Sequence, residues 1–443
     1  MDRVTPPVPR VADSDAADPH PDPDAIRRTL EAVWRMEAAK VTAVVARLVS
    51  DIGLAEDLAQ DAFLQALEQW PRDGLPDKPG AWLTATARRR AIDRIRRDVN
   101  LRDKLQQVGH AEELRTADLA EADFDQALED IDDDVLGLVF AACHPVLTAQ
   151  ARISLTLRMI GGLTTREIAR AFLTTESTIG QRISRAKKAL RADGVTIEVP
   201  SGADLPPRLA SVLEVVYLIF NEGYAATSGR DWVRGDLMEE AIRLGRVLAA
   251  LAPKEPEVHG LVALMEIQAS RTRARLAADG SPVLLLDQDR TRWDWSLIRH
   301  ALGALDRATQ LSGMPGPYVL QAAIAACHAR ARTPDETDWA RIVTLYDELA
   351  RVRPSPVVDL NRAVAMSYAA GPAPALAVVD RLVESGSLAD YHLLPSVRGD
   401  LLRKLGREDE AREEFRRAAA MTGNEAERRL LLERAGDDGP ADR

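Results

Sequence analysis

Helical periodicity runs through almost the whole chain and limits the folds that are open to it. From residue 25 to residue 435, Ala, Leu, Arg and Glu recur with the spacing of helix faces, and the alternating runs of Val, Ile and Thr that are typical of strands are missing. The fold class is therefore expected to be all-α. The chain has 443 residues, of which 46% are apolar, so a sizeable core can form. The longest apolar run, Val135 to Cys143, is too short to span a bilayer.

Composition divides the chain into successive zones. Residues 1–24 are rich in Pro and Asp, lack the apolar core of a signal peptide and are expected to be a disordered N-terminus. Residues 25–104 are helical and end in a basic segment, and residues 105–134 are strongly acidic. Residues 135–193 hold a two-helix motif, and a long helical array is expected over residues 205–435.

Some classes of protein are disfavoured by the residues present. The two cysteines, Cys143 and Cys327, are far apart in sequence, which fits a reducing cytoplasm better than a disulfide scaffold. The His residues show no ligand-like spacing with Cys, and the chain has neither a Ser/His/Asp order nor a phosphate-binding glycine loop. We therefore expect a cytoplasmic protein that is not an enzyme and needs no metal or cofactor.

The stretch TTREIARAFLTTESTIGQRISRAKKALR, residues 164–191, has the order of a helix-turn-helix. Thr164 or Thr165 can cap a first helix with Glu167 in a capping box, and Thr175 or Ser177 can cap a second helix. Ile179, Ile183, Ala186 and Leu190 then face inward at helical spacing. The opposite face offers Ser177, Thr178, Gln181, Arg182, Arg185 and Lys188. In helix-turn-helix proteins such side chains reach base edges and phosphates in the major groove, whereas the alternative here is an Arg-rich, solvated helix hairpin.

Local charge favours DNA contact although the whole chain carries a formal net charge of -11. Between Arg152 and Arg191 the basic residues far outnumber the acidic residues, which are Glu167 and Glu176. Because salt screens charges beyond about 8 Å, this local excess decides what the motif binds.

A second basic helix is expected over AWLTATARRRAIDRIRR, residues 81–97. Leu83, Ala87, Ala91 and Ile95 line its apolar side. A Pro/Gly-rich loop is expected before it, over residues 70–80. Upstream lies an amphipathic helix for which we expect an exposed acidic rim made of Asp51, Glu56, Asp57, Gln60 and Asp61. An acidic helix directly before a basic helix suggests two partners, one basic and one a nucleic acid.

These segments resemble a known family. AEDLAQDAFLQALEQW followed by PGAWLTATARRRAIDRIRR, then an acidic spacer and the helix-turn-helix, resemble regions 2 and 4 of bacterial RNA polymerase sigma factors. The chain has no third domain between these two regions, and in this short form it is similar to the extracytoplasmic function (ECF) group. The resemblance covers about residues 27–192. The array behind it, with YLIFNEGYAATSG at residues 217–229, resembles the tetratricopeptide-like extension of one ECF subgroup.

The resemblance implies partners and roles for particular residues. Core RNA polymerase would be bound through its β′ clamp helices and β flap, and the residues that match the clamp-binding helix are Asp57, Gln60, Asp61 and Phe63. The residues that match the helix for the −10 promoter element are Trp82, Arg88, Arg89, Asp93, Arg94 and Arg97, and the loop from Pro71 to Gly80 matches the segment that pockets a flipped base. The −35 helix would use Ser177, Thr178, Gln181, Arg182, Arg185 and Lys188. Many relatives have Asn at Arg89 and a basic residue at Gly180, so the base preferences stay open.

The acidic spacer has two readings. The resemblance implies that residues 110–134 thread the positively charged channels of the polymerase, where acidic side chains imitate RNA. The other reading is a solvated tether between the two DNA-binding units.

The array shows a recurring pattern of small and apolar residues. The sets are Ala241, Gly245 and Leu248; Ala301, Leu305 and Ala308; Ile342, Tyr346 and Leu349; Ala375, Val379 and Leu382; and Ala411, Phe415 and Ala418. The later copies are spaced close to the tetratricopeptide period of about 34 residues. A generic helical bundle remains the alternative. Four tryptophans could line a ligand or peptide groove or fill contacts between repeats: Trp232, Trp293, Trp295 and Trp339. A cluster of polar residues also lies close together in sequence: Asn221, Glu222, Tyr224, Ser228 and Asp231. Its Asn-Glu pair could be catalytic, but such residues more often satisfy helix ends or pack repeats.

The leading hypothesis is a sigma factor that binds core RNA polymerase and promoter DNA, with an extension that contacts the sigma domains and controls them in cis. The alternative is a stand-alone helix-turn-helix transcriptional regulator with a helical-repeat sensor, and a scaffold with a vestigial motif is a third reading. No membrane partner is expected.

Overall fold

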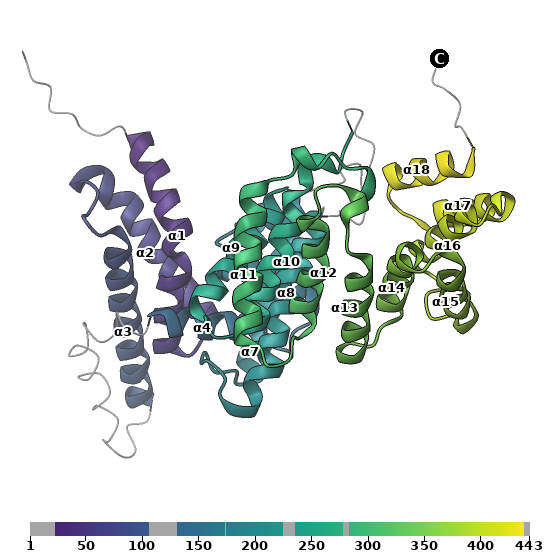
Figure 1. Cartoon of the computed structure of the whole chain (residues 1–443). Coiled ribbons are helices and arrows are strands. Elements are labelled where there is room, and N and C mark those ends of the chain that lie inside the picture. The colour runs from purple at the N-terminus through teal and green to yellow at the C-terminus, as the bar shows by residue number, and fades with distance from the viewer. Residues whose placement is uncertain (1–22, 106–130, 173, 225–234, 278–282, 438–443) are drawn as a thin grey trace, which may run out of the picture.

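The computed structural model describes residues 23–105, 131–172, 174–224, 235–277 and 283–437. These residues form α-helices and short 3-10 helices, and no β-strand occurs among them, so the expected all-α class is confirmed. No helix in the described ranges is both long and apolar enough to cross a membrane. Figure 1 shows an elongated molecule with the first helices at one end and the last helices at the other.

The first helical unit consists of α1 (Pro23–Val49), α2 (Ile52–Asp73) and α3 (Pro79–Leu105). Asp51 caps α2, since its side chain accepts hydrogen bonds from the backbone N–H groups of Gly53 and Leu54. The unit has its own core, in which Trp70 and Leu83 are fully buried. Ile95, expected on the apolar side of α3, is instead exposed.

The second helical unit consists of α4 (Ile131–Ala142), α5 (Ala149–Met159), α6 (Thr165–Ala171) and α7 (Glu176–Ala192). Most of the expected acidic spacer, residues 106–130, lies outside the described residues. Its last four residues are helical, so the expected boundary at residue 134 is too late. The reason is that Asp134 is buried at 8% exposure and accepts a hydrogen bond from Arg47 of α1 at 3.0 Å.

The extension follows a short connection and begins with α8 (Leu205–Tyr224), at the residue expected from the sequence. It continues with α9 (Gly235–Leu251), α10 (Pro256–Ser270), α11 (Trp295–Leu311) and α12 (Pro317–Arg330). The remaining helices are α13 (Trp339–Val352), α14 (Pro356–Ala369), α15 (Pro372–Ser385), α16 (Leu393–Lys404), α17 (Glu408–Met421) and α18 (Glu425–Ala435). From α13 onward each helix packs on the next one in the chain.

The hydrophobic cores do not follow the zones expected from composition. One core runs continuously from α4 through α12, so the helix-turn-helix unit and the first part of the extension are packed as a single body. Two smaller cores serve the later helices, one between α12, α13 and α14 and one from α14 to α18. The array of residues 205–435 is therefore divided between the body that holds α7 and a separate tail.

The recurring small and apolar positions of the array lie mostly at helix contacts. Ala301, Ala308, Ala411, Phe415 and Ala418 are fully buried. In the α13 set Ile342 and Leu349 are buried, whereas Tyr346 is only half-buried at the edge of the core. This burial is equally compatible with repeats and with a generic bundle.

Candidate nucleic-acid interface

The proposed −35 helix, α7, stands on a well-formed helix-turn-helix. The side chain of Thr164 accepts a hydrogen bond from the Glu167 N–H, and the Glu167 carboxylate accepts one from the Thr164 N–H, so the expected capping box is present. Thr175, not Ser177, caps α7 by accepting from the Thr178 N–H. The four expected inward residues of α7, Ile179, Ile183, Ala186 and Leu190, are all buried.

The opposite face of α7 is open. Ser177, Thr178, Gln181, Arg185 and Lys188 are exposed and Arg182 is partly exposed. The structure thus brings the six predicted side chains onto one accessible face. Glu176 near the start of α7 is 4.0 Å from Arg166 on α6, so one acidic residue of the motif is partly neutralised within it.

The proposed −10 helix, α3, presents its cations in a similar way. Arg89, Asp93, Arg94 and Arg97 are exposed, and Arg88 is partly buried. Trp82 packs edge-on against the buried Trp70, with the ring centroids 5.5 Å apart. The indole of Trp82 is therefore fixed at the start of α3, beside the loop that leads into this helix.

The loop before α3 is shorter than the sequence suggested. Residues 70–73 are the last turn of α2, which continues through Pro71, and only residues 74–78 connect the two helices. Helix α2 continues because Trp70 is a core residue at 2% exposure, and Gly74, with φ of 86°, then ends it. A base-accepting pocket would have to be built by these five residues and the helix ends.

The four candidates for polymerase contact lie on one helix, α2, but differ in exposure. Asp57 and Asp61 are exposed, and Gln60 and Phe63 are half-buried. Asp61 accepts a hydrogen bond from Arg90 of α3 at 3.3 Å, so part of the acidic rim is held by the neighbouring basic helix. Phe63 packs against Trp34 of α1 with ring centroids 4.7 Å apart.

The expected exposed rim is wrong at its first two members, which instead join the two helical units. Glu56 is buried at 8% exposure and accepts a hydrogen bond from Arg158 Nε of α5 at 2.7 Å and another from Lys187 of α7. Asp51 forms an ion pair with Arg191 at the end of α7. We call this set of five side chains, Asp51, Glu56, Arg158, Lys187 and Arg191, the acidic clamp.

The acidic clamp keeps Glu56 ionised. Burial raises the pKa of Glu56, but Lys187 and Arg158 outweigh this effect and hold the pKa below its ordinary value. Sequence reasoning missed the clamp because Glu56 sits at a spacing that fits either face of α2. The available signal was an excess of cations on α7, since Lys187 and Arg191 are not on the predicted DNA face.

Polar contacts tie the helix-turn-helix unit to the extension around the continuous core. Arg152 of α5 donates to Ser211 Oγ at 2.5 Å and pairs with Glu214 at 3.2 Å, both on α8. Ser211 in turn donates to the Cys143 carbonyl at 2.6 Å, and Arg243 of α9 donates to the Ile160 carbonyl at 3.2 Å. These contacts lie behind the helix-turn-helix. The predicted DNA face of α7 stays accessible among the described residues, so the extension does not cover it there.

The aromatic candidates of the extension behave differently from one another. Trp293 is buried and Trp295 is exposed, whereas Trp339 stacks on Tyr368 at 4.2 Å and lines a cavity. Asn221 and Glu222 are half-buried on α8, and Tyr224 lies under Arg275, whose guanidinium is 3.7 Å from the ring centroid. Ser228, Asp231 and Trp232 lie outside the described residues.

Comparison with known proteins agrees with this architecture. Three family models match: Sigma-70 region 2 over residues 33–100, Sigma-70, region 4 over residues 138–190, and a family of unknown function (DUF6596) over residues 208–309. The first two cover α1–α3 and α4–α7, and the third begins in α8 and ends in α11.

Individual relatives point the same way. The ECF RNA polymerase sigma factor SigC of Mycobacterium tuberculosis is 30% identical over 168 residues, which are 38% of this chain and 80% of the relative. SigK of Mycobacterium ulcerans, also an ECF RNA polymerase sigma factor, is 31% identical over 34% of this chain and 78% of its own length. An uncharacterized protein of Rhizobium meliloti is 45% identical over 86% of this chain and 89% of its own length, so the extension is shared with it. The chain belongs to the ECF RNA polymerase sigma factors.

Proposed function

We propose that this protein binds core RNA polymerase and directs it to promoters, with α3 contacting the −10 element and α7 the −35 element. What supports this assignment most directly is that both basic helices present their cations to solvent on separate units. Asp57 and Asp61 on α2 are the acidic side chains open to the polymerase. The exposed face of α7 offers base-reading and phosphate-binding side chains in the order that helix-turn-helix proteins use.

We further propose that the extension controls promoter recognition in cis by fixing the position of α7. The support is the core shared by α4, α5, α8 and α9, together with the bonds from Arg152 to Ser211 and Glu214. The extension acts from behind the helix-turn-helix and leaves the DNA face open. It therefore aims α7 and does not cover it.

The acidic clamp adds a second element of control. It holds the C-terminal half of α7 against the start of α2, so the two DNA-binding units lie closed upon each other. Promoter binding by both helices at once requires a spacing set by the DNA. Opening of the clamp is then a step between the free protein and the promoter complex.

Initiation by purified core RNA polymerase at a cognate promoter tests the assignment. The double variant Arg182→Glu and Arg185→Glu reverses two cations on the predicted DNA face, and we expect it to reduce initiation at least about 30-fold, because each lost phosphate or base contact weakens binding by about 1–3 kcal/mol. The control variant is Arg299→Glu, an exposed arginine on α11, outside the helix-turn-helix. Unchanged start-site choice in the double variant would contradict the proposed role of α7, and tight duplex binding without polymerase would favour the stand-alone regulator.

Cis control has its own test in the full chain. Arg152→Ala removes the two bonds to α8 without touching the DNA face. We expect altered promoter output with unchanged affinity for core polymerase. Equal output from the variant and the parent would rule out control through this contact.

A further inference from the structure

A cavity of about 420 Å³ lies inside the extension, where α8, α10, α12, α13 and the start of α14 meet. Its volume falls within the range of about 300–1,000 Å³ that is common for small-molecule sites. Leu264, Ile324 and Leu349 contribute apolar wall, and the amide side chains of Gln268 and Gln321 contribute polar groups. The wall of the cavity is thus about equally apolar and polar, so a ligand that fits it needs both an apolar part and a polar group.

The charge of this cavity is opposite to that of the chain. Arg271 and Arg353 line it, and no Asp or Glu is among its lining residues. Within the described part of the chain, neither guanidinium forms an ion pair. Arg271 donates to the Tyr224 hydroxyl at 3.3 Å, but its Nε is buried without a hydrogen-bond partner among the described residues. Arg271 is partly buried and Arg353 is exposed, so an anion in the cavity would satisfy the buried Nε of Arg271 and could also reach the guanidinium of Arg353.

Two further features of the wall favour an anion. Ser355 caps α14, and Ser355 and Val357 line the cavity, so the positive end of the α14 dipole points toward it. His328 also lines the cavity, and its Nδ1 is buried without a partner in the described ranges. Burial, helped by Arg271 and Arg290, lowers the pKa of His328 to about 4, so the ring is neutral at pH 7 and one nitrogen can donate to a ligand.

From these observations we propose that this cavity binds a small organic carboxylate, with the acid group between Arg271 and Arg353 and the apolar part on the wall formed by Leu264, Ile324 and Leu349. A bare inorganic anion would satisfy the cations but leave the apolar wall in contact with water. A neutral ligand would leave the buried Nε of Arg271 without a hydrogen-bond acceptor, and the exposed guanidinium of Arg353 without an anion.

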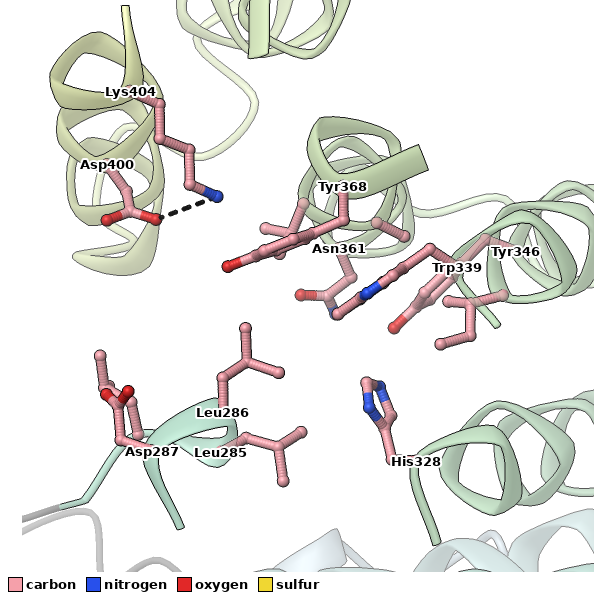
Figure 2. Close-up of a pocket in the computed structure, with 14 residues that line it drawn as sticks. Leu285, Leu286, Asp287, His328, Trp339, Tyr346, Asn361, Tyr368, Asp400 and Lys404 are labelled. Atoms are coloured by element: carbon pink, nitrogen blue, oxygen red, sulfur yellow. Dashed lines mark ion pairs between the residues drawn. The ribbon is translucent and has the colours of Figure 1, made fainter. Parts of the chain in front are cut away.

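A neighbouring cavity helps to locate the site. It measures about 340 Å³ and shares Leu285, His328, Tyr346 and Asn361 with the first cavity. Figure 2 shows Leu285 and Leu286 facing His328 and Asn361 across its open space, with Asp400 paired to Lys404 at the rim. Asp287 and Asp400 both line this second cavity, so the acid group belongs in the first.

The position of the site connects it to promoter recognition. Tyr217 lines the cavity from α8, and Ser211 and Glu214, which hold Arg152, lie on the same helix one to two turns earlier. A ligand that shifts α8 would therefore shift the support of α7. This consequence rests on the proposed cis control, whereas binding of the carboxylate does not.

Binding is tested by calorimetry on the full-length protein with benzoate as the probe and benzamide as its neutral match. We expect benzoate to bind and benzamide to bind at least about tenfold more weakly. Arg353→Glu should weaken benzoate binding by at least about tenfold. Arg351→Glu is the matched control, since Arg351 is exposed two residues away and does not line the cavity, and its affinity should equal that of the parent.

Several results would overturn the proposal. They are no benzoate binding up to about 10 mM, equal binding of benzamide, equal weakening by the Arg351 variant, or displacement of benzoate by inorganic phosphate at equal concentration. Circular dichroism melting checks that Arg353→Glu is folded, and Arg353→Gln replaces it if it is not. The calorimetry contains no polymerase. Its outcome therefore does not depend on whether the extension controls promoter recognition in cis.

Discussion

At the scale of single residues, Glu56 takes part both in the proposed control of promoter binding by the acidic clamp and in the stability of the fold. Its buried carboxylate binds two cations from the other helical unit, Arg158 and Lys187. Removing one partner of a buried ion pair leaves uncompensated charge and commonly costs about 3–5 kcal/mol. We expect Glu56→Gln to lower the free energy of unfolding by about 3 kcal/mol, measured by urea denaturation at pH 7. The control is Glu68→Gln on the exposed side of the same helix, which should change stability by less than about 0.5 kcal/mol.

The same residue sets a pH dependence. The folded-state pKa of Glu56 lies below its ordinary value of about 4.5, so its contribution to stability is complete above that value and is lost as the pH falls through the lower, folded-state pKa. The parent protein should therefore lose stability more steeply than Glu56→Gln as the pH is lowered below about 4.5. Parallel pH profiles for the two proteins would show that Glu56 is not the titrating group.

At the scale of elements, the sequence predicted where the helices of the helix-turn-helix are capped, but it left two candidate capping residues for each helix. Two threonines stand side by side at the start of α6, and only Thr164, the residue before the helix, makes both bonds of the capping box. We expect Thr164→Ala to lower stability by about 1 kcal/mol and Thr165→Ala to have a much smaller effect, because Thr165 makes no cap bond. Thermal unfolding of both variants measures the difference, and equal losses would mean that the cap is not specific to Thr164.

Close helix packing makes a second element-scale prediction. A Cβ placed on Gly260 of α10 would lie 2.7 Å from the backbone nitrogen of Val319 on α12, whereas one placed on Gly303 of α11 would meet nothing within 4 Å. Gly260→Ala should therefore destabilise the protein by about 1–3 kcal/mol. Gly303→Ala should stabilise it by about 0.5–1 kcal/mol through helix propensity. Denaturant midpoints of the two variants should move in opposite directions, and a shared direction would contradict the packing.

The sequence predicted the features that depend on residues close together in the chain, and it did not predict the contacts between residues far apart in the chain. Helix faces, caps and the exposure of the six-residue predicted DNA face of α7 depend on neighbours within a few turns, and periodicity predicts them. The roles of Glu56 and Asp51 depend on cations about 100 residues or more away in sequence, such as Lys187 for Glu56, which no local pattern contains. The end of α2 was misplaced for a similar reason. Pro71 and Gly74 suggest a loop, but burial of Trp70 carries the helix on to Asp73.

At the scale of the whole molecule, the continuous core decides which part of the chain can be removed. Helices α4 and α5 bury Val139 and Leu155 in a core to which α8 and α9 contribute Val212 and Leu244. A chain that ends at residue 193 would expose this surface. Burial of one such side chain is worth about 1.5–3 kcal/mol, so losing several is comparable with the total stability of about 5–15 kcal/mol of an ordinary domain.

We therefore expect a chain that ends at residue 193 to lose cooperative unfolding of its helix-turn-helix unit, even though that unit is complete in sequence. A chain that ends at residue 370 is the matched comparison, because it keeps the whole continuous core and the core between α12 and α14 while losing α15–α18. It should unfold cooperatively and should still support initiation with core polymerase. The measurements are thermal unfolding by circular dichroism and limited proteolysis with mass mapping. Cooperative unfolding of the shorter chain at the temperature of the full chain would show that α4–α7 are independent of the extension. In that case control in cis would have to act through the α8 contacts of Arg152 alone, since the shared core would no longer be needed to position α7.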